Sequence, residues 1–118
     1  MLKDATGFNH IYLATGYTDM RKGIDGMLMV IKGEFGINPF DTGDIFLFCG
    51  RRAHSIKALV FEEDGFVLLN KRLLKGHFQW PRNTREMRDI PQELYKDLMD
   101  GLAIEYRCTI EKINAQYV

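Results

Sequence analysis

The stretch from Phe66 to Pro81 constrains this 118-residue chain more than any other. It starts with four consecutive apolar residues, becomes cationic, and ends with Phe78, Trp80 and a proline. A short apolar run bounded by turn residues predicts a buried strand. Because this strand runs out into cations and aromatic rings, it can be a core element and a binding edge at once. We therefore expect the rest of the chain to build a small platform for that edge.

Two further strands lead into this stretch. Asp44 to Cys49 is apolar on both faces, and Ser55 to Phe61 alternates between two faces. The connections, residues 50–54 and Glu63 to Gly65, are short enough for hairpins, and we expect Gly65 to supply a positive φ. The three strands therefore predict an antiparallel meander. Residues 8–14 predict a further strand at the N-terminal side.

Two segments have the residue spacing of a helix, one before these strands and one after them. Thr18 and Asp19 resemble N-cap residues, apolar residues recur every three or four positions from Met20, and Gly36 fits a C-terminal cap. A second helix is predicted from Ile90 to Leu102, with Pro91 in its first turn. The pattern predicts an α+β fold, in which one or two helices cover an antiparallel sheet of four to five strands.

Length and composition fit one globular domain. The chain is 46% apolar and 27% charged, which argues against disorder. We expect a core of about residues 8–102, a polar linker at 82–89 and a weakly patterned tail at 103–118. Cys49 and Cys108 lie far apart and outside any metal-ligand spacing, so we expect free, buried thiols. No signal peptide or membrane span is evident, which favours a cytoplasmic protein.

The formal net charge is zero, but the charges are segregated. Residues 71–88 hold six cations against Glu86, and residues 89–105 hold five acids against Lys96. In the predicted meander, the turn at 50–54 and the end of the last strand lie at the same end of the sheet. A basic edge is therefore predicted, formed by Arg51, Arg52, Lys57, Lys71, Arg72 and Lys75.

A second anion site is predicted in the segment Thr18-Asp19-Met20-Arg21-Lys22-Gly23. If these residues open a helix, Arg21 and Lys22 oppose the helix dipole, and a bound phosphate would reverse that balance. The alternative is that the two cations pair with Asp19 or Asp25 on the surface and contribute little.

The predicted basic edge can contact DNA phosphates, with Phe78 and Trp80 as candidates for stacking on unpaired bases. The alternative is a solvated edge that prevents pairing between sheets, with both aromatic side chains in the core.

No catalytic group, metal site or cofactor is predicted. The three histidines lack ligand spacing, and Asp19 and Asp25 do not share a helix face well. An acidic helix at residues 90–102 could instead dock a basic partner, or it could simply cover the sheet.

The segments at residues 12–26, 39–52, 56–66 and 71–81 resemble a known family. It is the TnpB accessory-protein family, encoded by the second open reading frame of insertion sequence 66 transposons, and not the RNA-guided nuclease of the same name. The resemblance implies a role in transposition beside a larger transposase that cleaves DNA. We therefore expect a non-catalytic accessory factor that binds DNA, such as transposon ends, through the basic edge. The alternative is an adaptor that binds the transposase without recognising DNA.

Overall fold

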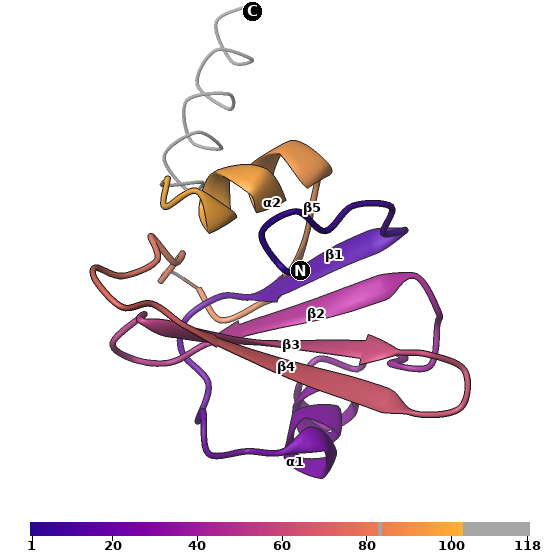
Figure 1. The fold of residues 1–118 in the computed structure, drawn as a ribbon. Helices are drawn as coiled ribbons and strands as arrows, with labels where there is room; N and C mark the ends of the chain where they lie inside the picture. The colour runs from indigo at the N-terminus through magenta and orange to yellow at the C-terminus, as the bar shows by residue number, and fades with distance from the viewer. Residues whose placement is uncertain (83, 103–118) are drawn as a thin grey trace, which may run out of the picture.

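A computed structural model describes residues 1–82 and 84–102, so the predicted tail at 103–118 and Cys108 lie outside the described residues. Five strands form one sheet in the order β4-β3-β2-β1-β5 (Figure 1). Their bounds are β1 His10–Ala14, β2 Asp44–Cys49, β3 Ser55–Phe61, β4 Phe66–Arg72 and β5 Met87–Ile90. Two helical segments complete the fold, which confirms the predicted α+β class.

The predicted meander is present. β2, β3 and β4 pair antiparallel, and β4 runs back along β3 from Phe61↔Phe66 to Ser55↔Arg72. The β3–β4 turn differs from the prediction in one detail, because the positive φ, 69°, belongs to Glu63 and not to Gly65. At the opposite end of the two strands, Ser55 pairs with Arg72, so the β2–β3 turn and the end of β4 lie at the same end of the sheet, as predicted.

The sheet is not wholly antiparallel. β1 pairs parallel to β2, with His10↔Asp44 to Leu13↔Leu47 in register. A parallel neighbour needs a long crossover, and the helical segment between β1 and β2 provides it.

This crossover helix begins later than predicted. α1 spans Ile24–Met29 with Gly23 as its N-cap residue, and a π-helical turn, η1, continues over Val30–Glu34. The predicted start at Thr18 and Asp19 is therefore wrong. The predicted cap is confirmed: Gly36 has φ 66°, its N–H donates to Lys32 O, and the Ile37 N–H donates to Ile31 O.

The segment predicted as a linker also differs. Its last residues form β5, which pairs antiparallel with β1 on the far edge of the sheet. Ile90 ends this strand, and α2 then spans Gln92–Met99 with Pro91 as its N-cap residue. The predicted helix at 90–102 is therefore shorter than expected at both ends.

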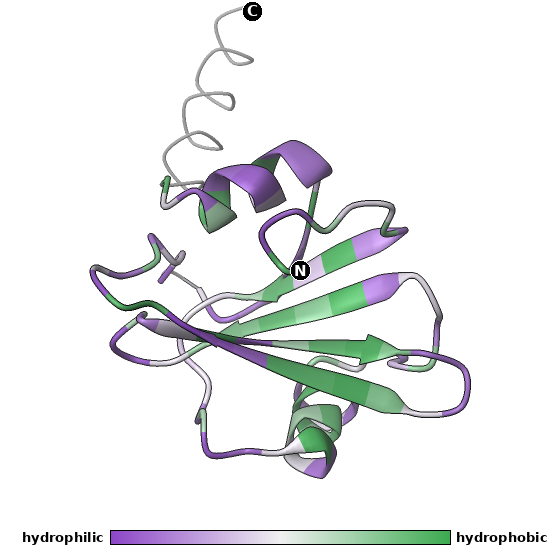
Figure 2. Ribbon diagram, viewed as in Figure 1, coloured by the Kyte–Doolittle hydropathy of each residue, from purple (hydrophilic) through white to green (hydrophobic). Residues whose placement is uncertain are grey.

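The helices lie on opposite faces of the sheet (Figure 1). On one face, Met27 and Ile31 of the α1–η1 segment pack with Phe46, Phe48 and Leu59. On the other face, Tyr95 and Leu98 of α2 belong to one buried cluster with strand residues that include Leu13, Leu47 and Ala58. Figure 2 shows β4 changing from hydrophobic near Phe66 to hydrophilic toward Arg72.

Cys49 is fully buried and unpaired, as predicted, and burial raises the pKa of its thiol to about 11. Among the described residues, no helix is long and apolar enough to span a membrane.

Candidate functional site

The loop after β1 and the β2–β3 turn lie against each other. The Thr18 N–H donates to Cys49 O at 2.9 Å, which joins the loop to the end of β2. Met20 packs on Gly50 so closely that a Cβ there would lie 2.8 Å from Met20 Cγ. Glycine at this position therefore allows the close approach of the two segments.

Between them is a hollow of about 460 Å³. It is lined by residues 17–21 of the loop and residues 50–55 of the turn and of β3. The structure thus brings together two segments that sequence analysis treated as separate anion sites. The lining includes Arg21, Arg51 and Arg52 against a single carboxylate, Asp19.

Arg51 is ordered by an aromatic neighbour. Its Nη2 donates to the Tyr17 hydroxyl at 2.7 Å, and its Cζ lies 4.4 Å from the centroid of the Tyr17 ring. Arg52 is exposed and has no ion-pair partner within the part of the chain that the structure describes. The turn therefore offers two cations that no carboxylate neutralises there.

Arg21 is paired within its own loop. Its Nε and Nη2 donate to the Asp19 carboxylate at 3.0 and 2.8 Å, and its backbone N–H also donates to Asp19. The Arg21 guanidinium and this N–H hold the pKa of Asp19 well below its usual range, while Asp19 raises the pKa of Arg21. The surface-pair alternative is therefore what the structure shows for Arg21.

The helix-dipole reason for a phosphate site at this loop is wrong, because α1 begins only at Ile24. Asp19 closes a turn that precedes the helix, and the Thr18 hydroxyl accepts a hydrogen bond from Arg85. Neither side chain caps α1.

Of the six cations of the predicted basic edge, Arg51 and Arg52 line the hollow, whereas Lys71 and Arg72 together line a second hollow with residues 1–3. Lys57 Nζ donates to the Lys22 carbonyl at 2.9 Å on the α1 face, so its charge is used within the fold. Along β4, Arg72 shares the face of Leu68, while Lys71 shares the face of Leu69, which packs on the α2 side. Lys75 is exposed in the loop after β4. Only Arg51 and Arg52 of these six line the hollow.

The two predicted stacking residues belong to the core. Phe78 is 2% exposed and Trp80 is 5% exposed, and Trp80 Nε1 donates to Ala14 O at 2.9 Å. Neither ring is therefore available to stack on a base in this structure. The core alternative was the correct interpretation of both aromatic side chains.

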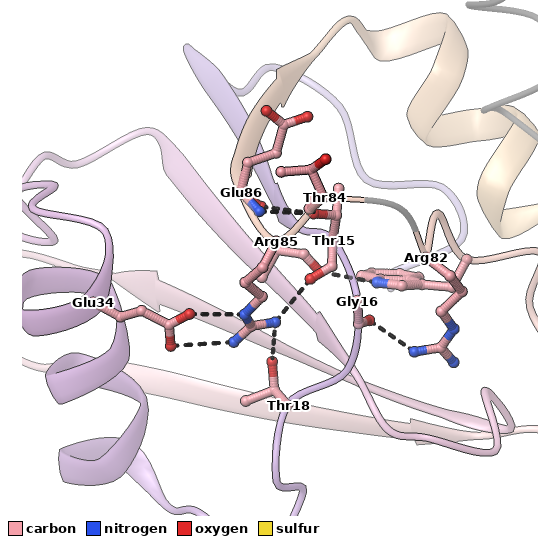
Figure 3. A network of polar contacts seen from close by, with 10 residues as sticks. Thr15, Gly16, Thr18, Glu34, Arg82, Thr84, Arg85 and Glu86 are labelled. Atoms are coloured by element: carbon pink, nitrogen blue, oxygen red, sulfur yellow. Dashed lines mark hydrogen bonds and ion pairs between the residues drawn. The ribbon is translucent and has the colours of Figure 1, made fainter.

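Sequence analysis missed two arginines that hold the hollow in shape, because it assigned both to a linker. Arg82 donates to Gly16 O at 2.7 Å, Gly50 O at 2.8 Å and Arg51 O at 3.2 Å, which ties the loop to the turn. Figure 3 shows the Gly16 contact beside the network around Arg85. No spacing in the sequence identifies these contacts, since their partners are backbone carbonyls far away in the chain.

Arg85 fastens the same loop from its other side. It donates to the Glu34 carboxylate at 2.8 Å, to Thr15 O at 2.8 Å and to Thr18 Oγ1 at 3.2 Å (Figure 3). The Thr15 hydroxyl in turn donates to Thr84 O and accepts from the Glu86 N–H. The loop is therefore held to η1 and to the segment before β5.

The hollow has a cationic and partly aromatic lining. Among residues 1–82 and 84–102, no group of three or more His, Cys, Asp or Glu side chains could hold a metal ion. Asp19, a carboxylate considered for catalysis, is paired with Arg21. Guanidinium groups beside an aromatic ring are suited to binding a phosphate or carboxylate.

The chain is similar to a known protein family and to two curated relatives. The family model described as "IS66 Orf2 like protein" matches residues 9–108. "Uncharacterized protein y4hO" from Sinorhizobium fredii is 37% identical over 71 residues, which span 60% of this chain and 61% of that protein. "Uncharacterized protein y4jC" from the same organism is 30% identical over 92 residues, which span 78% of each chain. No solved structure is significantly similar to this chain.

Proposed function

We infer the function of this chain from one premise: it belongs to the IS66 Orf2-like family. Membership implies an accessory role in the transposition of an insertion sequence. We propose that the chain fills this role by binding DNA, such as the ends of the element, through the hollow between the β1–α1 loop and the β2–β3 turn. The proposal assigns no catalytic step to the chain.

The observation that supports this proposal is that two arginines of the β2–β3 turn, Arg51 and Arg52, line the hollow. Arg51 and Arg52 line it with no ion-pair partner among the described residues, and Arg21 lines it as the partner of Asp19. Arginine binds phosphate through a planar set of donors, and it stays charged at every physiological pH. The hollow, at about 460 Å³, is also within the size range of small-ligand sites.

Two arginines outside the hollow tie its two walls together by hydrogen bonds. Arg82 holds the backbone carbonyls of Gly16, Gly50 and Arg51, and Arg85 holds those of Thr15 and the hydroxyl of Thr18. Ordering a site in advance reduces the entropy that binding must overcome. Arg82 and Arg85 therefore support binding although neither lines the hollow.

A fluorescence-anisotropy titration tests the proposal with a transposon-end duplex, a scrambled duplex and a single strand. We expect salt-sensitive binding that falls about tenfold or more in the Arg51→Glu/Arg52→Glu variant. The matched pair is Arg52→Glu and Lys32→Glu, which change the charge equally. Lys32 is exposed beside Phe40, far from the turn and near the β3–β4 hairpin. Equal effects of the two single changes would contradict a localised site.

The adaptor alternative predicts a different result. If the folded chain binds none of the three DNAs, contact with the transposase becomes the leading proposal. The outer side of α2 is the candidate surface, since Leu94, Tyr95 and Leu98 pack inward. In that case, co-purification with the transposase should be lost when Glu93, Asp97 and Asp100 are reversed in charge.

A further inference from the structure

The hollow carries an exposed aromatic ring that phosphate binding does not require. Tyr17 is 52% exposed and lines the hollow together with Arg51 and Arg52. The other large exposed ring among the described residues is Phe40, which packs edge-on against Phe61 and Phe66 at the other end of β3 and β4. Tyr17 is therefore the exposed ring that adjoins the arginine cluster.

The Tyr17 ring is held in place. Arg51 lies over it at 4.4 Å and also donates to its hydroxyl at 2.7 Å. The backbone on both sides of this contact is fixed, because Arg82 donates to Gly16 O and to Arg51 O. An aromatic side chain that is already ordered loses little conformational entropy when a planar ligand stacks on it.

The rest of the lining suits a ligand with a planar apolar part and an anionic part. Met20 and Ala53 contribute apolar surface beside Tyr17, while Arg51 and Arg52 contribute the positive charge. A nucleotide combines these two parts. A base in a duplex has its faces covered by its neighbours, so only an unpaired base can offer a face for stacking.

We propose that the hollow binds an unpaired nucleotide of single-stranded DNA, with its base stacked on the Tyr17–Arg51 pair and its phosphate held by Arg51 and Arg52. This inference rests on the proposed DNA-binding function and specifies its ligand. It assigns Tyr17 a stacking role that sequence analysis had given to Phe78 and Trp80, both of which are buried.

The test compares three ligands of equal length: a single strand, the same strand with abasic positions, and the duplex. Wild type should bind the single strand more tightly than either of the others. Replacing a stacking residue weakens binding by roughly 5- to 150-fold per base, so Tyr17→Leu should lose affinity in this range for the single strand. It should change little for the abasic strand. Tyr17→Phe keeps the ring and should retain most of the affinity.

Phe40→Leu is the matched control, because it removes an exposed ring that lies away from the arginines. Equal affinity for single strand and duplex, together with an unchanged Tyr17→Leu variant, would overturn the stacking inference. In that result the Arg51→Glu/Arg52→Glu variant would still lose binding, and the proposed function would stand. If wild type binds no DNA at all, both proposals fail together.

Discussion

At the scale of single residues, one contact gives the fold a predictable pH dependence. His10 Nδ1 lies 2.7 Å from Asp89 Oδ2, at the edge where β1 meets β5. The hydrogen bond to Asp89 raises the pKa of His10 above its usual 6.5, with smaller contributions from the charges of Asp89, Asp44 and Asp41. Protonated His10 is therefore favoured in the folded state.

The sign of the effect follows from this direction. A raised pKa in the folded state gives stability that is complete below about pH 6.5 and is lost as the pH rises through the folded-state value. We expect the free energy of unfolding to fall as the pH rises above about 6.5. Urea unfolding at a series of pH values should show this slope in wild type and a flatter profile in both His10→Gln and Asp89→Asn. Parallel profiles for wild type and His10→Gln would contradict the assignment.

At the scale of elements, Arg85 joins parts of the fold that are distant in sequence. Its guanidinium binds Glu34 of η1, Thr15 at the end of β1 and Thr18 in the loop, and it lies 5.1 Å from the Phe35 ring centroid. We expect Arg85→Met to lower the free energy of unfolding by about 1–3 kcal/mol, because it removes charge-assisted hydrogen bonds to partly buried acceptors. It should also weaken DNA binding, because the β1–α1 loop that carries Tyr17 loses its hydrogen bonds to Arg85.

Glu34→Gln is the matched change for this prediction. It removes only the half-exposed ion pair, so it should cost less than about 1 kcal/mol and leave DNA binding nearly unchanged. Chemical denaturation and anisotropy on the two variants give both quantities. If Arg85→Met costs no more than Glu34→Gln, the hydrogen bonds to Thr15 and Thr18 do not stabilise the loop.

Also at the scale of elements, the sequence predicted the strands and caps that are marked by a pattern within one continuous stretch of several residues. β2 and β3 have their predicted bounds, and Gly36 caps the crossover helix, because apolar runs and a left-handed glycine are readable in one stretch. β5 was missed because four residues carry almost no periodicity. Thr18 and Asp19 resembled a helix cap, but their side chains bind Arg85 and Arg21 instead. Long-range contacts of this kind leave no pattern in the sequence.

At the scale of the whole molecule, the zero net charge means that DNA binding must come from local charge. The number of phosphates neutralised distinguishes the hollow from the wider edge that the sequence predicted. Each neutralised phosphate of a single strand contributes about −0.7 to the slope of log affinity against log salt. If Arg51 and Arg52 are the effective cations, the wild-type slope should be about −1.4, whereas six cations would give about −4.

Anisotropy titrations of a single strand across a range of salt concentrations measure this slope. Arg52→Gln should reduce its magnitude by about 0.7, whereas Lys71→Gln should leave it unchanged, because Lys71 does not line the hollow. A wild-type slope near −4, or an equal loss in the two variants, would mean that cations outside the hollow also contact the strand. The site would then be an extended edge and not the hollow.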